Sequence, residues 1–372
     1  MVTDLQVCRL FRQTWRSVAT IKTNMAKKSD DESPGWHAID DALRPIYGDR
    51  EPYHVGTIVS WAMGGPDPIH GISAYKNDKP VPHWHYVTYG FTELWDKEST
   101  NKEVSGYGFE LTFRCARSTT EKKPPNWAFN FLQNLGRYVF ETGNCFGVGH
   151  TMPLNGPIAV DADTLIHAIS FIDDIQLPPI NTPNGEVEFL QIVGLTMDEL
   201  EAISSWNARA FLELRRESDE LLITDLDRRS WLKDKTFAKE VAKRTKEDGS
   251  SCGWLALVLE CETNKTPVRV KIQTIAVEGF KRRLLGRLPY GRELVLSDKE
   301  ATAVFKPAKK SQMKLVEDAV TISLSDEDLQ VFTSGLEPHA GVHNIPGIRD
   351  LIVEIVRTEI TDGDGNVVEI VE

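Results

Sequence analysis

The chain has 372 residues, enough for two domains, and its hydrophobic fraction of 41% and charged fraction of 26% are those of an ordinary globular protein. Its formal net charge of −12 argues against a general basic surface, so no nucleic-acid partner is expected. No run of about 18 apolar residues occurs, so the sequence predicts no membrane-spanning helix and no membrane partner.

The cysteines are few, irregularly spaced and free of any CxxC pair. They are Cys8, Cys115, Cys145, Cys252 and Cys261. This usage is typical of reduced, mostly buried thiols, and we therefore expect a cytoplasmic protein.

Residues 1–33 are expected to be a disordered or mis-assigned N-terminal extension. The first 24 residues combine several basic residues with a single acid, Asp4, and lack the apolar core of a secretory signal. A mitochondrial-type presequence fits this composition, and a translation start at Met25 is the simpler interpretation.

The first domain is predicted to span residues 34–246. It opens with a short amphipathic helix over residues 34–43, because Trp36, Ile39 and Leu43 recur at helical spacing. A strand over residues 52–63 and a Gly-Pro turn over residues 64–68 follow.

Two further strands, residues 86–91 and 108–114, come next. In the second of them Phe109, Leu111 and Phe113 alternate with polar residues, which predicts an inward apolar face. We expect Glu110 and Thr112, which lie between them, to be less buried or hydrogen-bonded.

His83 and His85 flank Trp84 on a predicted strand, where side chains two positions apart share a face. A metal pair is geometrically allowed there, but zinc needs a third and usually a fourth ligand. No nearby residue has the spacing for it, so structural histidines are the favoured interpretation.

A helix over residues 124–140 carries an apolar stripe, and a glycine-rich turn over residues 143–150 follows it. The turn has no P-loop lysine, so no nucleotide is expected. Beyond an apolar segment over residues 165–171, Asp173 and Asp174 read as solvent-exposed loop acids. A hairpin-like turn over residues 182–185 leads into a strand that ends at Val193.

Later elements complete a mixed α+β pattern. Thr196 and Glu199 have capping-box spacing at a helix start, residues 221–224 read as a short strand, and residues 233–248 as a solvated helix. Gly and Ser cluster after that helix, which predicts a short linker over residues 247–251.

The second domain is predicted over residues 252–372. We expect strands over residues 255–261, 268–275, 293–296, 319–324 and 349–360. Ser325 and Asp328 have the spacing of a helix cap, and residues 362–366 read as a hairpin turn between strands. The predicted fold class is thus α/β in the mixed α+β sense, with two mixed-sheet domains.

Several motifs, in this order, resemble the suppressor of fused family. The main ones are Gly64-Gly-Pro-Asp-Pro68, Pro82-His-Trp-His-Tyr86, Gly106-Tyr-Gly-Phe-Glu-Leu-Thr-Phe-Arg114, Arg137-Tyr-Val-Phe140 and Phe189-Leu-Gln-Ile-Val-Gly194. The resemblance covers about residues 34–253 and thins beyond them to residues 285–292.

This resemblance implies a non-enzymatic clamp of two domains. Animal members hold zinc-finger transcription factors of the Hedgehog pathway and take a short peptide between the domains as an added strand. Bacterial members are inferred to be immunity proteins that neutralise polymorphic toxins. The chain has no long low-complexity run after Gly253, so the compact bacterial type is expected, with a toxin or a regulatory protein as partner.

The resemblance places the partner site near Tyr138, Phe146, His150 and Asp174, between the two domains. The sequence departs from the animal pattern at one point, since residues 147–150 read Gly-Val-Gly-His where an acid is expected before the histidine. This departure weakens the expectation that the same peptide is bound.

No catalytic motif such as GxSxG, HExxH or a Rossmann fingerprint occurs, so neither an enzyme nor a cofactor is expected. The alternative is a metal-dependent enzyme that uses the region of His83, His85, His150 and Asp174.

Overall fold

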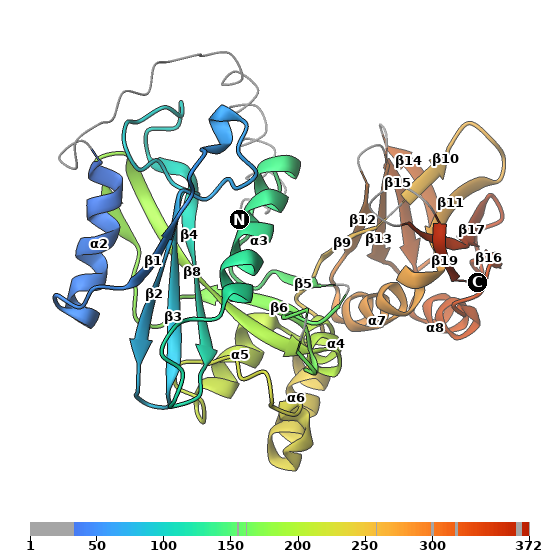
Figure 1. Ribbon diagram of the computed structural model, residues 1–372. Coiled ribbons are helices and arrows are strands. Elements are labelled where there is room, and N and C mark those ends of the chain that lie inside the picture. The colour runs from blue at the N-terminus through green and yellow to red at the C-terminus, as the bar shows by residue number, and fades with distance from the viewer. Residues whose placement is uncertain are drawn as a thin grey trace. The chain divides into compact units, whose positions relative to one another are not determined.

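The chain folds into two mixed α/β units, which confirms the predicted fold class (Figure 1). This computed structural model describes residues 33–371 except residues 155, 161, 258, 299–300, 317–318 and 362–366. The first unit runs to Leu200 and includes Ala208–Lys233, whereas the second combines Glu201–Asn207 with Asp234–Glu372. Two predictions, the extension before residue 33 and the turn over residues 362–366, concern segments outside the described residues.

An eight-stranded sheet forms the centre of the first unit, in the order β1-β2-β3-β4-β8-β6-β5 with β7 paired to β8. Its strands are β1 (Tyr53–Gly56), β2 (Gly71–Asn77), β3 (His83–Tyr89), β4 (Val104–Ala116), β5 (Thr151–Pro153), β6 (Ile166–Asp173), β7 (Ile180–Thr182) and β8 (Gly185–Thr196). Strands β4 and β8 run parallel in the middle, and β1 and β5 are the two edges.

Helices cover both faces of this sheet. The helices of this unit are α2 (Pro34–Tyr47), α3 (Asn126–Thr142), α5 (Ala208–Arg216) and the single turns η2 (Trp61–Met63) and η3 (Trp231–Lys233), while α4 (Met197–Ser205) begins in this unit and ends in the second. Helix α3 packs on one face of the sheet and α2 on the other, so each helix buries a separate core (Figure 1).

The predicted inward face of β4 is confirmed. Phe109, Leu111 and Phe113 are buried against α3. Glu110 lies between them and is also fully buried, so the hydrogen-bonded alternative is the correct one. Its carboxylate accepts from the backbone N–H of Gly90 and Thr92 and from the Thr88 and Thr92 hydroxyls. Burial nevertheless raises the pKa of Glu110 to about 7.

Several strand predictions for the first and second units need correction. The strand expected over residues 52–63 stops at Gly56, before a loop and η2. Residues 221–224 form no strand, because Leu222 adopts φ +48° and only Thr224 bridges Cys115. The strand expected over residues 349–360 divides into β17 and β18 around Arg357.

The second unit holds a five-stranded sheet, a four-stranded sheet and a two-stranded hairpin. Its strands are β9 (Trp254–Ala256), β10 (Leu259–Glu262), β11 (Val268–Gln273), β12 (Leu294–Ser297), β13 (Thr302–Pro307), β14 (Gln312–Val316), β15 (Ala319–Leu324), β16 (Gly341–Asn344), β17 (Leu351–Val356), β18 (Thr358–Thr361) and β19 (Val367–Val371). Its helices are α6 (Lys235–Asp248), η4 (Thr274–Ala276), α7 (Val277–Arg287), η5 (Leu288–Tyr290) and α8 (Asp326–Gly335).

Helices α7 and α8 contribute Phe280, Leu284, Leu329 and Phe332 to the core of the second unit. The predicted cap of α8 is confirmed, since the Ser325 hydroxyl accepts from the backbone N–H of Asp328 at 3.2 Å. The strand expected over residues 255–261 is two strands, β9 and β10.

Trp206 belongs to the second unit although it precedes α6 by a long stretch of chain. Its side chain is 2% exposed, and its indole N–H donates to the Asp248 carboxylate at 2.8 Å. Its carbonyl accepts from the backbone N–H of Ser251 at 2.6 Å, so Trp206 ties the end of α6 to the segment that leads into β9.

Candidate partner-binding site

Three aromatic rings stack at the C-terminal end of α3. The ring of Tyr138 stacks on Phe146 with centroids 5.6 Å apart, and Phe146 stacks on Phe171 of β6 at 4.3 Å. The chain can return here because Gly143 ends the helix in a left-handed conformation, φ +71°. Phe146 and Phe171 are buried while Tyr138 is half-buried, so Tyr138 is the partly exposed ring of this stack.

His150 lies directly after this stack and is exposed. Its backbone N–H donates to Gly147, and its carbonyl accepts from the N–H of Phe171 at 3.1 Å. The backbone is therefore fixed at the point where β5 begins. The structure thus brings together three of the four predicted site residues, Tyr138, Phe146 and His150.

Strand β5 is the edge of the sheet beside these residues, and among the described residues its one partner strand is β6. The carbonyl of His150 and the N–H of Leu154 bond to β6. Because such bonds alternate along an antiparallel pair, Thr151 and Pro153 turn their backbone groups away from β6. Thr151 therefore offers a free edge to an incoming strand, and Pro153 has no N–H to offer.

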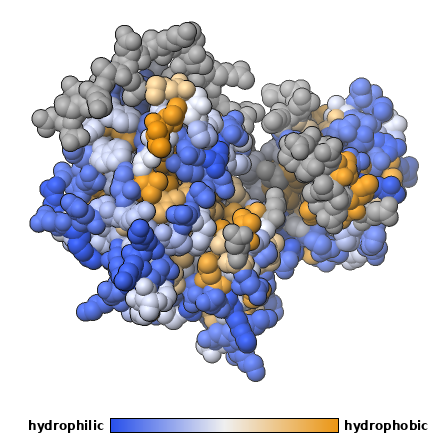
Figure 2. Space-filling view, in the orientation of Figure 1, coloured by the Kyte–Doolittle hydropathy of each residue, from blue (hydrophilic) through white to orange (hydrophobic). Residues whose placement is uncertain are grey.

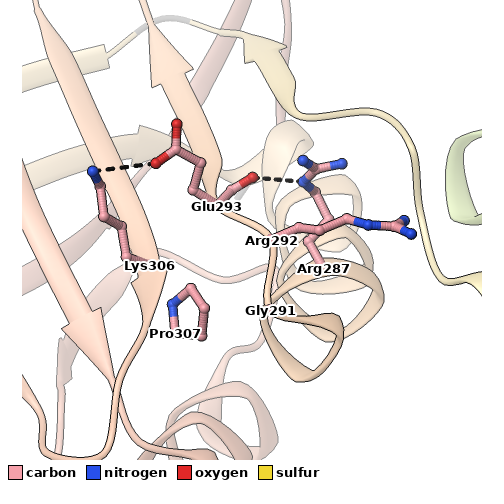
Figure 3. A pocket seen from close by; sticks show the side chains of 6 residues that line it. All are labelled: Arg287, Gly291, Arg292, Glu293, Lys306 and Pro307. Atoms are coloured by element: carbon pink, nitrogen blue, oxygen red, sulfur yellow. Dashed lines mark hydrogen bonds and ion pairs between the residues drawn. The ribbon is translucent and has the colours of Figure 1, made fainter.

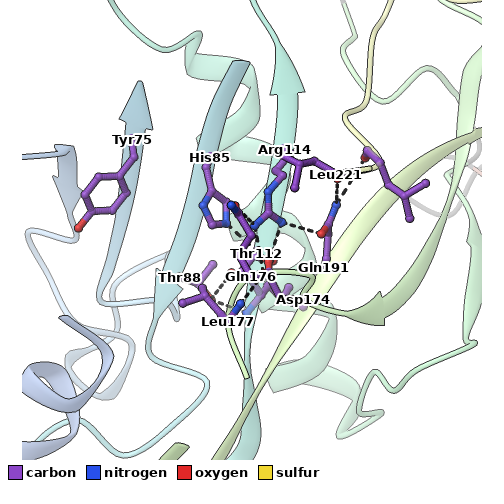
Figure 4. Close-up of polar contacts among 12 residues, drawn as sticks. Tyr75, His85, Thr88, Thr112, Arg114, Asp174, Gln176, Leu177, Gln191 and Leu221 are labelled. Atoms are coloured by element: carbon purple, nitrogen blue, oxygen red, sulfur yellow. Dashed lines mark hydrogen bonds and ion pairs between the residues drawn. The ribbon is translucent and has the colours of Figure 1, made fainter. Parts of the chain in front are cut away.

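The prediction that Asp174 is a solvent-exposed loop acid was wrong. Its side chain is fully buried, whereas that of its neighbour Asp173 is half-exposed and pairs with Arg209. The Asp174 carboxylate binds both terminal nitrogens of Arg114, at 2.7 and 3.0 Å, and accepts from the Thr112 hydroxyl (Figure 4). The expectation failed because Arg114, 60 residues earlier in the chain, reaches Asp174 across the sheet.

The Arg114–Asp174 pair lies on the opposite face of the sheet from the Tyr138 stack. On β4, Thr112 and Arg114 alternate with Leu111 and Phe113, which pack against α3. Asp174 therefore lies on the side of the sheet that α2 covers, away from the other three predicted residues. Its role in partner binding stays a prediction.

Several further groups complete this buried pair. Arg114 also donates to the side-chain oxygens of Gln191, at 2.6 Å, and Gln176, at 3.0 Å (Figure 4). The backbone N–H groups of Gln176 and Leu177 donate to Asp174. Burial alone would raise the pKa of Asp174, but the charge and hydrogen bonds of Arg114, together with the adjacent His85, hold it well below its usual range.

His85 lies next to this pair and is fully buried. Its Nδ1 is 2.6 Å from the hydroxyl of Tyr47, whose pKa is raised to about 12 by burial. Its Nε2 lies 3.6 Å from Asp174, which is too long for a hydrogen bond. Burial and the Arg114 charge lower the pKa of His85 to about 4, so the ring is neutral and shares a hydrogen bond with the Tyr47 hydroxyl.

Arg114, Gln176 and Gln191 were not predicted from the sequence to be partners of Asp174. Arg114 carried a signal, since it lies on the polar face of the alternating strand. The two glutamines carried none. Their neighbours come from segments far apart in the chain.

The residues of the alternative metal site are not assembled for metal binding. His83 directs Nδ1 to the carbonyl of Val81 at 2.8 Å, and His85 faces Tyr47 and Asp174. Within the described ranges, no group of three or more His, Cys, Asp and Glu residues could hold a metal ion.

The described part of the chain also has no helix of the length and apolarity needed to cross a membrane.

The opposite edge of the sheet, β1, is exposed along its whole length. Tyr53 and Val55 of β1, with Ile58, Val59 and Met63 in the following loop, form an exposed apolar patch (Figure 2). This edge is therefore a second candidate surface, but none of the four predicted residues belongs to it.

Comparison with known proteins shows what this architecture is similar to. Residues 65–229 match the family model for suppressor of fused protein (SUFU). The suppressor of fused homologues of Homo sapiens and Mus musculus are each 36% identical to the chain over 244 residues, which cover 59% of this chain. The chain spans about half the length of these curated relatives, with 50% of each covered.

Two solved structures extend the likeness to three dimensions. The crystal structure of Drosophila Suppressor of Fused covers 89% of this chain and 99% of its own, with a TM-score of 0.72 at 22% identity, and so shares the fold. The crystal structure of the Sufu–Fu complex matches 58% of this chain and 99% of its own, with a TM-score of 0.54 at 32% identity.

Proposed function

Because this chain belongs to the suppressor of fused family over residues 65–229, we propose that it is a non-enzymatic clamp that binds a protein or peptide and thereby sequesters or neutralises it. A similar structure was solved as a Sufu–Fu complex, which supports a protein as the ligand class. The absence of a catalytic motif in the sequence agrees with a binding role.

The free edge of β5 beside Tyr138, Phe146 and His150 is the observation that carries the proposal. A partner strand added to this edge gains main-chain hydrogen bonds, and the partly exposed ring of Tyr138 provides an aromatic anchor. Phe146 and Phe171 support that ring from below, so little side-chain freedom is lost when the anchor is buried.

Asp174 acts differently in this proposal from its predicted role as a direct contact. Its carboxylate is saturated by Arg114, Thr112 and two backbone N–H groups. We therefore assign to Asp174 a positioning role, since it fixes the turn after β6, the strand that holds β5.

A finer proposal concerns the partner. We propose a cytoplasmic immunity protein of the compact bacterial type with a polymorphic toxin as its partner, on the strength of the resemblance and of the uninterrupted sequence after Gly253. Co-expression with the product of a neighbouring toxin-like gene tests it, and rescue of growth is the expected result. That the partner lies between the two units stays a prediction.

The test of the β5 site begins with a pull-down that identifies the partner by mass spectrometry. Tyr138→Ala should then weaken binding at least about tenfold, which is roughly 1.4 kcal/mol, and His150→Ala should weaken it less. Tyr53→Ala is the matched control, because it removes a partly exposed tyrosine from the other edge of the sheet.

Circular dichroism must show that each variant is folded. Normal binding by Tyr138→Ala would contradict the β5 site. A loss of binding confined to Tyr53→Ala would assign the partner to the β1 edge instead.

A further inference from the structure

A small hollow of about 470 Å³ lies in the second unit where α7 ends. Its lining residues are Arg287, Gly291, Arg292, Glu293, Lys306 and Pro307 (Figure 3). Arg287 is the last residue of α7, Glu293 precedes β12, and Lys306 and Pro307 end β13. Three cationic side chains thus share this hollow with one carboxylate.

The two arginines lie next to each other. Arg287 donates through Nη1 to the carbonyl oxygen of Ser250 at 2.8 Å, and Arg292 donates through Nη1 to the same oxygen at 3.1 Å. Two guanidinium groups that share one acceptor atom repel each other through space. A neutral carbonyl does not balance their charges, so an anion placed here would stabilise both.

Arg287 is the more confined of the two, since it is 8% exposed. Its Nε donates to the carbonyl of Glu293 at 2.6 Å, so its bonds run to main-chain oxygens (Figure 3). Among the described residues neither arginine forms an ion pair with a carboxylate. Burial lowers the pKa of Arg287, and the charge of Arg292 adds to this effect, whereas Cys252 and Glu293 oppose it.

Glu293, the one carboxylate of the hollow, is directed to the opposite side. It pairs with Lys306 at 3.2 Å, and both side chains are about half-exposed (Figure 3). This ion pair leaves a double positive charge on the two arginines. Lys306 is long and partly exposed, so it can turn from Glu293 to a bound anion.

We propose that this hollow is a phosphate-binding site formed by Arg287 and Arg292, with Lys306 as a third ligand. A phosphate group carries a charge of about −1.5 to −2 at neutral pH, which matches the two uncompensated guanidinium charges. The planar donors of arginine suit phosphate oxygens, and a lysine adds a mobile point charge. A carboxylate carries half that charge and should bind more weakly.

Titration calorimetry of the full chain at constant ionic strength tests the proposal. Inorganic phosphate should give saturable binding at millimolar concentration, and acetate should bind at least about tenfold more weakly. O-phosphoserine serves as a second probe, which distinguishes a site for a phosphorylated side chain from one for the free ion. Absence of saturable binding to both phosphate probes would overturn the proposal, as would equal binding of acetate.

Charge-altering variants distinguish a ligand site from a purely structural pair of arginines. Arg292→Gln removes the exposed arginine and should weaken phosphate binding at least about tenfold. Glu293→Gln should tighten phosphate binding, because it removes the one negative side chain lining the hollow, which repels the phosphate. If the two arginines were purely structural, this variant would give no gain in affinity. Lys265→Gln, in an exposed turn of the same unit, removes equal charge outside the hollow and should leave the affinity unchanged. Unchanged affinity in Arg292→Gln, or weaker binding in Glu293→Gln, contradicts the assignment.

Discussion

At the scale of single residues, the adjacent acids Asp173 and Asp174 have opposite environments. The first is half-exposed and pairs with Arg209 on the surface, whereas the second is enclosed with Arg114. A buried ion pair is costly to break, because the partner that remains is a buried charge without compensation.

Asp174→Asn should lower the free energy of unfolding by about 3–5 kcal/mol, because it leaves the Arg114 guanidinium unpaired. Asp173→Asn is the matched control and should cost at most about 1 kcal/mol, since exposed pairs contribute little. Urea unfolding followed by fluorescence measures both. Equal costs for the two variants would contradict the burial of Asp174.

His85 should make stability depend on pH. Its pKa is about 4 in the folded protein against 6.5 for the free side chain, so the unfolded chain takes up a proton first as pH falls. The contribution of His85 to the free energy of unfolding is therefore fully present above pH 6.5. It declines by about 3 kcal/mol in all as the pH falls to 4. The Asp174 contribution lies in a lower window, since its pKa is held below 3.8.

His85→Gln removes the titrating ring and keeps a neutral polar side chain. Unfolding free energies of the wild type and the variant should therefore converge as pH falls from 6.5 to 4. His54, His70 and His83 also have lowered pKa values, but they are common to both proteins and cancel in the difference. A constant difference across this range would show that His85 does not titrate as described.

At the scale of secondary structure elements, strand addition to β5 depends on one backbone group. Thr151 turns its N–H away from β6, so Thr151→Pro removes a donor from the outer edge without breaking the β5–β6 ladder. We expect partner binding to fall at least about tenfold. Thr151→Val keeps both the N–H and the branched side chain, and it should bind as the wild type does. Equal binding by both variants would exclude main-chain pairing at this edge.

The elements that the sequence predicted well are those with a strong local period. Phe109, Leu111 and Phe113 alternate cleanly, and the apolar stripe of α3 repeats at helical spacing, so both were correct. The strand predicted over residues 221–224 was wrong, because an apolar run of residues indicates burial but does not distinguish a strand from a buried loop. Leu221 is buried as a loop residue whose carbonyl accepts from Gln191 at 2.7 Å.

Of the candidate site, the sequence could indicate only what lies close together in the chain. Tyr138, Phe146 and His150 are joined by one turn, so their grouping was predictable. The pairing of Arg114 with Asp174 and the edge position of β5 depend on the order of strands in the sheet. That order is set by contacts between distant segments, which have no local signal.

At the scale of the whole molecule, the two units exchange short segments of sequence, since Trp206 serves the second unit and Ala208–Lys233 the first. The predicted boundaries, a domain over residues 34–246 and another over residues 252–372, stay predictions. So does the expectation that residues 1–33 lie outside the fold.

Trp206→Ala should destabilise the second unit by about 3–5 kcal/mol, the usual cost of emptying a large buried aromatic site. Hydrogen exchange should show the loss in β13 and β15 and spare β4 and β8. Trp254→Ala, in the same unit, removes a tryptophan that is 46% exposed and should cost much less. Equal protection loss in the strands of both units would show that the two unfold together.

Pro153 also bears on how the protein avoids associating with itself. Exposed sheet edges are places where identical chains can pair without limit and aggregate. Strand β5 is three residues long and ends in a proline, so within it only Thr151 can donate outward. Two copies that met at this edge would form too few bonds to hold each other. An edge of this kind stays open to a partner that brings its own anchor for Tyr138, while it stays closed to further copies of the same chain.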